Sequence, residues 1–280
     1  MTTDATLPTC RQHPDRETRL ACPRCRRPTY AECLVVAGDG GQVCAVCRDE
    51  LAAAATADRQ PRLQQSGAPI TFGLLLVFAL IFLAGEIDDG ILARTLNGGA
   101  QINVAVRAGE WWRVLTATML HANLTHLLFN GYALYALGAH LERSVGSGGF
   151  AALYLASGIA GGVAFLFSSP EQVAVGASGA IFGLFGAWFA ASWVNRDTPH
   201  GRAGLSRFGM LLLINLALPL FIPGIAWQAH MGGMAAGLLV GFDWARRTRS
   251  GTRPTAQARL VVPLLIAGAL LLGLLWYTMA

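Results

Sequence analysis

The chain has 280 residues, of which 54% are hydrophobic and only 13% are charged, and its mean hydropathy is +0.46. A soluble domain of this length needs more polar surface than this composition supplies, so we predict a membrane protein. The formal net charge is +5, and every basic residue that contributes to it is an arginine, because the sequence contains no lysine. We interpret this charge as a signal of membrane topology and not of nucleic-acid binding.

The N-terminal part differs from the rest, because all six cysteines lie between Cys10 and Cys47. The candidate zinc ligands are Cys10, His13, Cys22, Cys25, Cys33, Cys44 and Cys47. Ligand pairs separated by two residues, as in C-x2-H and C-x2-C, are typical of zinc sites. A domain this small has little apolar core and needs a bound metal or a similar cross-link to fold well. The alternative to zinc binding is that these cysteines form disulfides. No signal peptide precedes the first long apolar run at about Ile70, so we expect a cytoplasmic head with reduced thiols.

After the head, seven apolar segments are long enough to cross about 30 Å of hydrocarbon. We expect spans at about 70–86, 123–142, 149–168, 176–195, 206–222, 226–245 and 260–279. Residues 106–123 mix polar and apolar side chains and are expected to form an interfacial loop. Arginines crowd the loops after the second, fourth and sixth spans, which predicts that these loops are cytoplasmic and that the C-terminus lies outside. Arginine without lysine, with abundant alanine and glycine, is typical of a GC-rich bacterial genome, so the expected location is a bacterial plasma membrane.

Polar side chains occur at matched depth in three spans that begin on the outer side. Ser178 begins the apolar part of the fourth span, His230 lies near the start of the sixth, and His126 and Asn130 share one face of the second. A neutral polar group in hydrocarbon costs a few kcal/mol unless it is paired or hydrated, so we expect these groups to face one another. Glycines four residues apart in the fourth and sixth spans would let these two helices touch.

The residues expected to meet there have the chemistry of a serine hydrolase. A serine hydroxyl becomes a nucleophile when a neutral imidazole accepts its proton, so His230 is the candidate base for Ser178. No carboxylate lies at comparable depth, which predicts a dyad with Phe182 packed against the imidazole. The Ser178 amide with the His126 and Asn130 side chains would stabilise an oxyanion. The alternative is that Ser178 is only a small residue at a helix interface.

Four motifs resemble the rhomboid family of intramembrane serine proteases, and the likeness extends from about residue 70 to 245. They are WWR at 111–113, HANLTHLLFN at 121–130, GASG at 176–179 and AHMGGMAAG at 229–237. One such motif alone is weak evidence for the family, whereas four motifs in the order of the family are specific evidence. The resemblance implies an all-α polytopic membrane protein with a six-helix core, a water-accessible cavity, Ser178 as nucleophile and His230 as base. The last apolar segment resembles the extra C-terminal transmembrane helix of some members.

The same resemblance implies roles for further residues. Those implied in oxyanion and substrate binding are His126, Asn130, Gly176 and Ala177, and those in supporting positions are Trp112, Arg113, His121, Glu142 and Phe182. Trp112 and Arg113 would belong to a loop that dips into the outer leaflet, and Glu142 would have a structural hydrogen-bonding role. His121 is expected to be a loop or water-cavity residue. Position 182 is often tyrosine in bacterial members, and we expect activity to survive with phenylalanine there.

The head resembles a B-box-like, cross-braced zinc finger of the kind found ahead of some bacterial rhomboids. The complete site that cross-bracing implies consists of Cys22, Cys25, Cys44 and Cys47. The incomplete site consists of Cys10, His13 and Cys33. It lacks a fourth ligand because Tyr30 stands at the position where such a finger has one. Asp15, Glu32 or water would have to complete this site, or it stays empty.

Two functions from different classes fit the sequence. The first is an intramembrane serine endopeptidase that hydrolyses peptide bonds in or near transmembrane segments of other proteins in the lipid bilayer, with structural zinc in the head and no cofactor for catalysis. The alternative is a catalytically silent rhomboid-like adaptor whose head recruits a cytoplasmic protein partner. The expected boundaries are 1–50 for the zinc-binding domain, 51–69 for a linker, 70–245 for the rhomboid core, and 246–280 for a basic loop with the extra helix.

Overall fold

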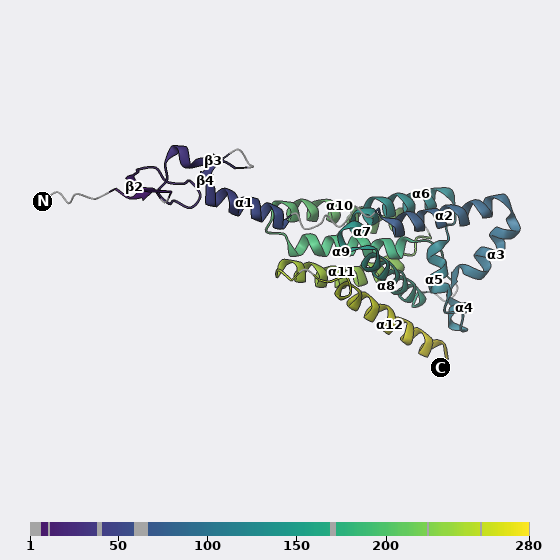
Figure 1. Cartoon of the computed structure of the whole chain (residues 1–280). Coiled ribbons are helices and arrows are strands. Elements are labelled where there is room, and N and C mark those ends of the chain that lie inside the picture. Colours follow the sequence, from purple (N-terminus) through teal and green to yellow (C-terminus); the bar gives the residue numbers. More distant parts are fainter. Residues whose placement is uncertain are drawn as a thin grey trace. The chain divides into compact units, whose positions relative to one another are not determined.

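The computed structural model describes residues 7–10, 12–37, 41–58, 67–168, 172–222, 224–252 and 254–279. The chain forms two compact units, the head Met1–Gln65 and the core unit Ser66–Ala280 (Figure 1). Residues 59–66, which belong to the expected linker, lie outside the described residues.

The head is built from short strands, one 3-10 turn and a helix. Its elements are β1 (Thr9–Cys10), β2 (His13–Glu17), η1 (Ala31–Cys33), β3 (Leu34–Val36), β4 (Gln42–Cys44) and α1 (Ala45–Asp58). β1 pairs antiparallel with β2, and β3 pairs antiparallel with β4. The residues buried at its centre are Cys22, Ala37, Val43 and Cys47. Half of this small centre is cysteine, so apolar burial alone gives the head little stability.

The core unit is almost entirely helical. Its elements are α2 (Pro69–Ile87), α3 (Asp89–Gly99), β5 (Gln101–Ile102), α4 (Asn103–Arg107), α5 (Arg113–Thr116), η2 (Ala117–Met119), α6 (Leu124–Ala133), η3 (Leu134–Gly138), α7 (Ala139–Val145), α8 (Ser147–Leu166), β6 (Val173–Ala174), α9 (Ser178–Val194), α10 (Pro199–Phe221), α11 (Trp227–Arg249) and α12 (Ala258–Met279). The predicted all-α polytopic fold is confirmed, and the two-residue strands β5 and β6 pair antiparallel beside the helices.

Each expected span coincides with a helix, and the second is the continuous run of α6, η3 and α7, with a π-helical turn at η3. Among the described residues, α2, α8 and α12 are each long and apolar enough to cross a membrane, and α9 is a shorter apolar helix. The helices over the other expected spans contain glycine, histidine or arginine, which lower their mean hydropathy.

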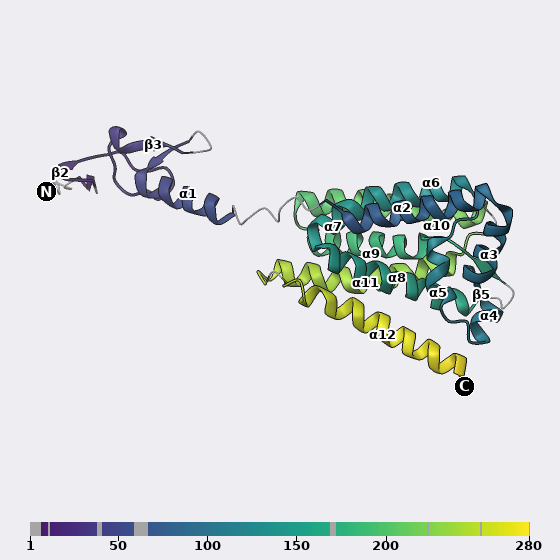
Figure 2. The same cartoon turned by 45° about the vertical axis from the view of Figure 1, so that its right-hand side comes forward.

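The helix α9 lies at the centre of the core unit, with α8 and α11 beside it (Figure 2). Residues 179–187 are all buried, which is the pattern of a helix covered on every side. A Cβ atom on Gly233 of α11 would meet the carbonyl oxygen of Gly179 at 1.9 Å, so only glycine allows this approach. The predicted contact between the fourth and sixth spans through glycine is therefore present.

The segment 106–123, expected as a loop, is partly helical, because α5 and η2 lie within it. The preceding α3 was also not predicted. Its start is capped by the Asp88 carboxylate, which accepts hydrogen bonds from the N–H groups of Gly90 at 2.6 Å and Ile91 at 3.2 Å. Short helices of this kind depend on caps and tertiary contacts, which hydropathy does not report.

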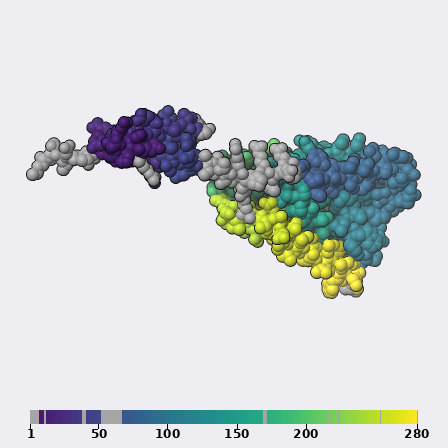
Figure 3. Space-filling model, in the orientation of Figure 1, coloured from purple at the N-terminus to yellow at the C-terminus, as the bar shows by residue number. Residues whose placement is uncertain are grey.

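The C-terminal helix α12 packs along α8 and leaves its outer side uncovered (Figure 3). Ala267 lies in a buried cluster with Ala156 and Ile159 of α8, and the Arg259 guanidinium donates to the Val145 carbonyl oxygen at 2.8 Å. Pro263 lies inside the helix without ending it, as expected from its place near the start.

Candidate active site and metal centre

Ser178 and His230 meet at one end of the core unit. Ser178 is the first residue of α9, and His230 lies in the first turn of α11. The His230 Nε2 atom is 2.8 Å from the Ser178 Oγ atom, which is hydrogen-bond distance. His230 is only 8% exposed, and Ser178 is half-buried. An imidazole in this position can accept the hydroxyl proton and activate the oxygen as a nucleophile.

The orientation of the His230 ring comes from an aromatic neighbour. Phe182, one turn after Ser178, stacks on the imidazole with ring centroids 4.1 Å apart and planes 10° apart. The His230 Nδ1 atom is buried and has no hydrogen-bond partner among the described residues. The arrangement therefore corresponds to a dyad, in which ring stacking takes the place of an orienting carboxylate.

Backbone and side chains next to Ser178 form a polar recess. Gly176 has φ +126°, a conformation that L side chains rarely adopt, and a Cβ atom there would meet the His126 Nε2 atom at 2.7 Å and the Asn130 Nδ2 atom at 3.7 Å. Ala177 is fully buried and precedes the first residue of α9. Because the first N–H groups of a helix have no intrahelical acceptor, the Ser178 amide suits an anion held beside these side chains.

The start of α6 fixes the two side chains over this recess. The Asn123 side-chain Oδ1 atom accepts a hydrogen bond from the His126 N–H group at 2.9 Å, which is an N-cap contact. The Asn130 amide donates to the His126 carbonyl oxygen at 3.2 Å. His121 is buried, its ring lies 5.2 Å from that of His126 and 4.9 Å from that of Phe78, and neither ring nitrogen has a partner among the described residues. Such a side chain suits a bound water molecule.

A cavity of about 30 Å³ lies beside Ser178. Its walls include Gln101 after α3, Thr118 of η2, and Gly158 and Gly162 of α8. The Gln101 amide is fixed by donating to the Gly162 carbonyl oxygen at 2.8 Å. A space of this size holds about one water molecule or a small side chain. Sequence reasoning missed these wall residues, because only the tertiary fold brings them to Ser178.

The tryptophan and arginine of the WWR motif have different surroundings. Trp112 is 42% exposed, which suits contact with lipid or the membrane interface. Arg113 is buried, and its guanidinium donates to the Ala100 carbonyl oxygen at 2.8 Å and pairs with the Glu110 carboxylate at 2.6 Å. The charge and the hydrogen bonds of Arg113 are therefore satisfied inside the protein, and the expected position of this loop in the outer leaflet stays a prediction.

Glu142 of α7 joins the starts of two other helices. Its carboxylate accepts hydrogen bonds from the N–H groups of Ile70 at 3.0 Å and Thr71 at 2.8 Å, from the Thr71 hydroxyl at 2.7 Å and from the Ser147 hydroxyl at 2.7 Å. Glu142 is only 1% exposed. It therefore caps α2 and holds the start of α8 through the Ser147 hydroxyl, at the end of the core unit away from Ser178.

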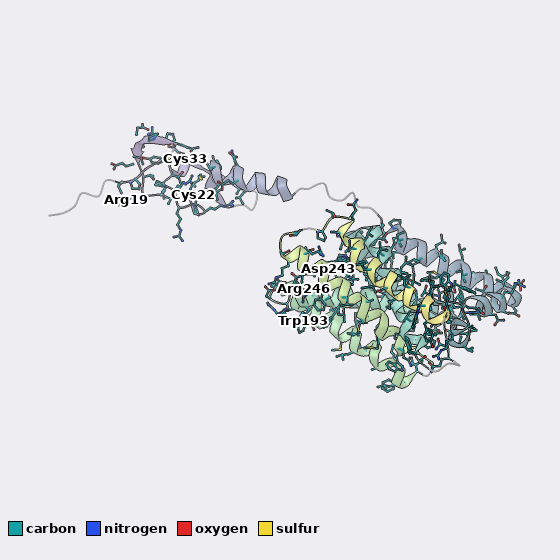
Figure 4. The ribbon with its side chains drawn as sticks, turned by 90° about the horizontal axis from the view of Figure 1, so that it is seen from below. Arg19, Cys22, Cys33, Trp193, Asp243 and Arg246 are labelled. Carbon is teal, nitrogen blue, oxygen red and sulfur yellow. The ribbon has the colours of Figure 1, made fainter. Side chains whose placement is uncertain are left out.

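In the head, four cysteines converge on one point, and Cys22 is labelled among them in Figure 4. They are Cys22, Cys25, Cys44 and Cys47, and their Sγ atoms lie within 4.8 Å of one another. Sulfurs about 3.8 Å apart are what a tetrahedral zinc ion with 2.3 Å bonds requires. Burial opposes ionisation of Cys22, but N–H groups of its neighbours outweigh it and lower its pKa to about 6. Burial and the neighbouring thiols raise the pKa of Cys47 to about 12, and a bound cation would favour its thiolate.

A second group in the head has three potential ligands. The Sγ atoms of Cys10 and Cys33 are 3.9 Å apart, and the Cys33 Sγ atom is 3.4 Å from the His13 Nδ1 atom. Burial opposes ionisation of Cys10, but hydrogen bonds from the His13 side chain and from backbone groups lower its pKa to about 6. Burial and the Cys10 thiol raise the pKa of Cys33. Two sulfurs and an imidazole at these distances also fit a zinc ion.

The part of the sequence that contains the serine site matches a known protein family. The sequence model described as Rhomboid domain matches residues 108–247, half of the chain, and this range includes Ser178, His230 and the recess. The chain belongs to the rhomboid family. This membership and the apolar helices identify the rhomboid as a multi-pass membrane protein.

Curated relatives agree with this assignment. The rhomboid protease GluP of Bacillus subtilis is 35% identical over 216 residues, 76% of this rhomboid and 41% of GluP. The rhomboid-family protein YdcA of the same organism is 37% identical over 175 residues, 62% of this rhomboid and 86% of YdcA. RHOMBOID-like protein 4 of Arabidopsis thaliana is 34% identical over 146 residues, 52% of this rhomboid and 37% of the plant protein. This rhomboid thus spans less than half of GluP and of the plant protein.

Proposed function

We propose that this rhomboid is a serine endopeptidase that hydrolyses a peptide bond in or beside a transmembrane segment of another protein, with Ser178 as nucleophile and His230 as base. The observation that carries this proposal is the 2.8 Å separation of the Ser178 Oγ and His230 Nε2 atoms. A silent membrane adaptor has no need for this contact.

The geometry supports a two-stage reaction. The Ser178 Oγ atom forms a bond to the scissile carbonyl carbon while its proton passes to the His230 Nε2 atom. The carbon–nitrogen bond then breaks, and His230 returns the proton to the leaving amine, which leaves an ester on Ser178. A water molecule, deprotonated by His230, hydrolyses that ester and restores the free serine. This chemistry uses no cofactor.

The recess before α9 supplies stabilisation for the oxyanion of each tetrahedral intermediate. The donors are the Ser178 N–H group and the side chains of His126 and Asn130, with Gly176 and Ala177 as the backbone beside them. One donor of this kind is worth about 2.7–4 kcal/mol in the transition state. Gly176 keeps this space open, because any side chain there would collide with the His126 ring.

The small cavity suggests a substrate class. A side chain that enters it from the residue before the cut meets close walls, which include Thr118, Gly158 and Gly162. Glycine, alanine or serine fits such a space, whereas leucine or phenylalanine does not. We therefore expect cleavage after a small residue, in a transmembrane segment that can locally unwind.

Charge at the far end of the core unit supports an orientation in a bacterial plasma membrane. The last turn of α11 there contains Arg246, Arg247 and Arg249, and Figure 4 shows Trp193, Asp243 and Arg246 at this end. The Arg249 guanidinium pairs with the Asp197 carboxylate at 2.7 Å and joins these two ends. By the positive-inside rule this end faces the cytoplasm, and the N-terminus lies on that side and the C-terminus outside.

The head adds a structural zinc-binding domain on the cytoplasmic side. Within residues 1–50 the proposed ligands are Cys22, Cys25, Cys44 and Cys47 for one ion, and Cys10, His13 and Cys33 for another. The convergence of the ligand atoms and the small buried centre support metal binding rather than a free thiol cluster. A zinc finger of this kind is suited to binding a cytoplasmic protein, and the rhomboid core would occupy residues 70–245.

Cleavage in a bilayer tests the proposal. Wild-type protein in liposomes is incubated with membrane-spanning peptides that differ only in one residue, glycine, alanine, serine, leucine or phenylalanine, and the products are identified by mass. Wild type is expected to cut after the small residues. Ser178→Ala and His230→Ala should lose roughly 10³-fold or more in rate, and Ser192→Ala, on the same helix, should cut normally. Binding of the peptides without cleavage by folded wild-type protein would favour the adaptor.

A further inference from the structure

The second ligand group of the head is short of one ligand. Cys10 and Cys33 are buried, and His13 is half-buried, so the three donors line a shielded point. Among the described residues, no further histidine, cysteine or carboxylate joins this group within the 4.8 Å that relates its members. The group therefore offers zinc two sulfurs and one nitrogen, whereas the Cys22 group offers four sulfurs.

Tyr30 occupies the place from which a fourth ligand would come. Its backbone N–H lies against the Cys10 thiol, and its carbonyl oxygen accepts from the Cys33 N–H group at 3.0 Å. The Tyr30 hydroxyl, however, donates to the Glu17 carbonyl oxygen at 2.5 Å. Its ring meets that of His13 edge to face, with centroids 6.1 Å apart. The Tyr30 hydroxyl is therefore bonded outside the ligand group, although the Tyr30 backbone lies where a side chain could reach the proposed zinc site.

The two acidic residues suggested by the sequence also lie elsewhere. Asp15 is exposed on β2, and the Glu32 carboxylate lies 3.5 Å from the Arg16 guanidinium. Neither carboxylate belongs to the ligand group. Zinc is almost always four-coordinate in structural sites, and a zinc site with three protein ligands keeps its fourth position for a ligand that exchanges.

We propose that the Cys10, His13 and Cys33 site holds zinc with one exchangeable position, and that this position accepts a thiolate from outside the head. This inference rests on the zinc occupancy proposed above. Two thiolates and a neutral imidazole leave a zinc ion formally uncharged, and a third thiolate gives the common Cys3His donor set. In the exchange, the bond to a zinc-bound water breaks, a zinc–sulfur bond forms, and the thiol proton passes to solvent.

Cobalt substitution of the full-length protein in detergent gives a direct test. Co²⁺ replaces zinc under anaerobic conditions, cobalt per chain is measured, and charge-transfer absorbance from sulfur to cobalt is followed while β-mercaptoethanol is added. Wild type is expected to bind two cobalt ions and to gain the absorbance of one additional thiolate. Tyr30→Cys should show that absorbance without added thiol and should not respond further. Tyr30→Phe is the matched control and should respond as wild type does.

The outcomes separate this inference from the zinc proposal. Two bound cobalt ions with no response to thiol would overturn the exchangeable position alone. One bound cobalt, rising to two in Tyr30→Cys, would also overturn it, because the three-ligand site would then be empty in the natural chain. Loss of cobalt or an altered spectrum in Tyr30→Phe would identify the phenol as the missing ligand and would likewise overturn it. Failure to bind any cobalt would contradict the zinc proposal itself.

The thiolate has two possible sources, a small thiol or a cysteine in another protein. The same titration is therefore repeated with a ten-residue peptide that contains one cysteine, with its serine counterpart as control. A response to both thiols shows that a protein cysteine can reach the position. A response only to β-mercaptoethanol assigns it to small thiols, because the buried flank formed by Cys10 and Cys33 then excludes a chain. Either result supports an exchangeable position on the zinc ion.

Discussion

Gly237 of α11 faces Gly183 of α9 so closely that a Cβ atom on Gly237 would meet the Gly183 carbonyl oxygen at 1.9 Å. The contact lies about two helical turns beyond His230. It fixes the distance between the helix that carries the serine and the helix that carries the histidine. The backbone packing of two glycines is therefore a condition for the hydrogen bond between Ser178 and His230.

Gly237→Ala is predicted to lower both stability and activity. The added methyl group meets backbone, which cannot rotate away, so α11 must shift at a cost of about 1–3 kcal/mol. Thermal unfolding in detergent should show a lower midpoint, and the rate of labelling by a serine-hydrolase probe should fall. Gly268→Ala on α12, where nothing lies within 4 Å of the new Cβ atom, is the control and should leave both unchanged. Equal effects of the two substitutions would contradict this packing account.

Phe182 is predicted to act through its ring and not through a polar group. Phe182→Tyr keeps the stacked ring on His230 and should retain activity within about twofold. Phe182→Leu removes the stack, which is worth about 0.5–1.5 kcal/mol, so labelling of Ser178 should slow by up to roughly tenfold. The rate of probe labelling at saturating probe measures this. An unchanged rate in Phe182→Leu would show that the imidazole is oriented by something else.

Glu142→Gln is predicted to destabilise the core unit without direct damage to the dyad. The variant amide points a donor at N–H and hydroxyl groups that already donate, so at least one hydrogen bond to the carboxylate is lost, at about 1.5–3 kcal/mol each. The midpoint of thermal unfolding should fall. Arg143→Gln, the exposed neighbour on α7, should have little effect. The role assigned to Glu142 fails if both variants unfold at the wild-type temperature.

Gly158→Ala is predicted to change substrate preference. The new methyl group would lie 3.4 Å from the Thr118 Cγ2 atom and 3.7 Å from the Ala180 Cβ atom, so it reduces the cavity without a clash. Cleavage after alanine or serine should fall more than cleavage after glycine. Gly148→Ala, on the same helix with only an ordinary contact to Leu260, is the control. A parallel fall for all three residues would mean that the cavity does not receive the side chain.

Much of the serine site could be predicted, because its polar residues occur within otherwise apolar helices. The sequence places four polar residues near the starts of three helices that begin on the same side: Ser178, His230, His126 and Asn130. Polar groups at the same depth in hydrocarbon are expected to contact one another. The Phe182 stack also follows from helical spacing. These inferences need only the helical period and the cost of unpaired polar groups in a membrane.

The rest depends on tertiary contacts that leave no local pattern. Gln101 reaches the cavity because β5 pairs with β6, two strands of two residues each that no periodicity indicates. Arg113 is buried with its guanidinium bound to the Ala100 carbonyl oxygen and the Glu110 carboxylate, and the WWR motif by itself does not indicate these partners. In the head, ligand spacing predicted both groups, but only the structure shows that the Tyr30 hydroxyl is bound to Glu17.

The most direct test of the central claim is labelling of detergent-solubilised protein with a fluorophosphonate probe, followed by peptide mass mapping of the adduct. Wild type is predicted to carry one adduct, on Ser178, and both Ser178→Ala and His230→Ala to carry none. Ser192→Ala should label like wild type. Folded wild-type protein that forms no adduct, or that still labels on Ser178 in His230→Ala at the wild-type rate, would contradict an activated Ser178 and His230 pair.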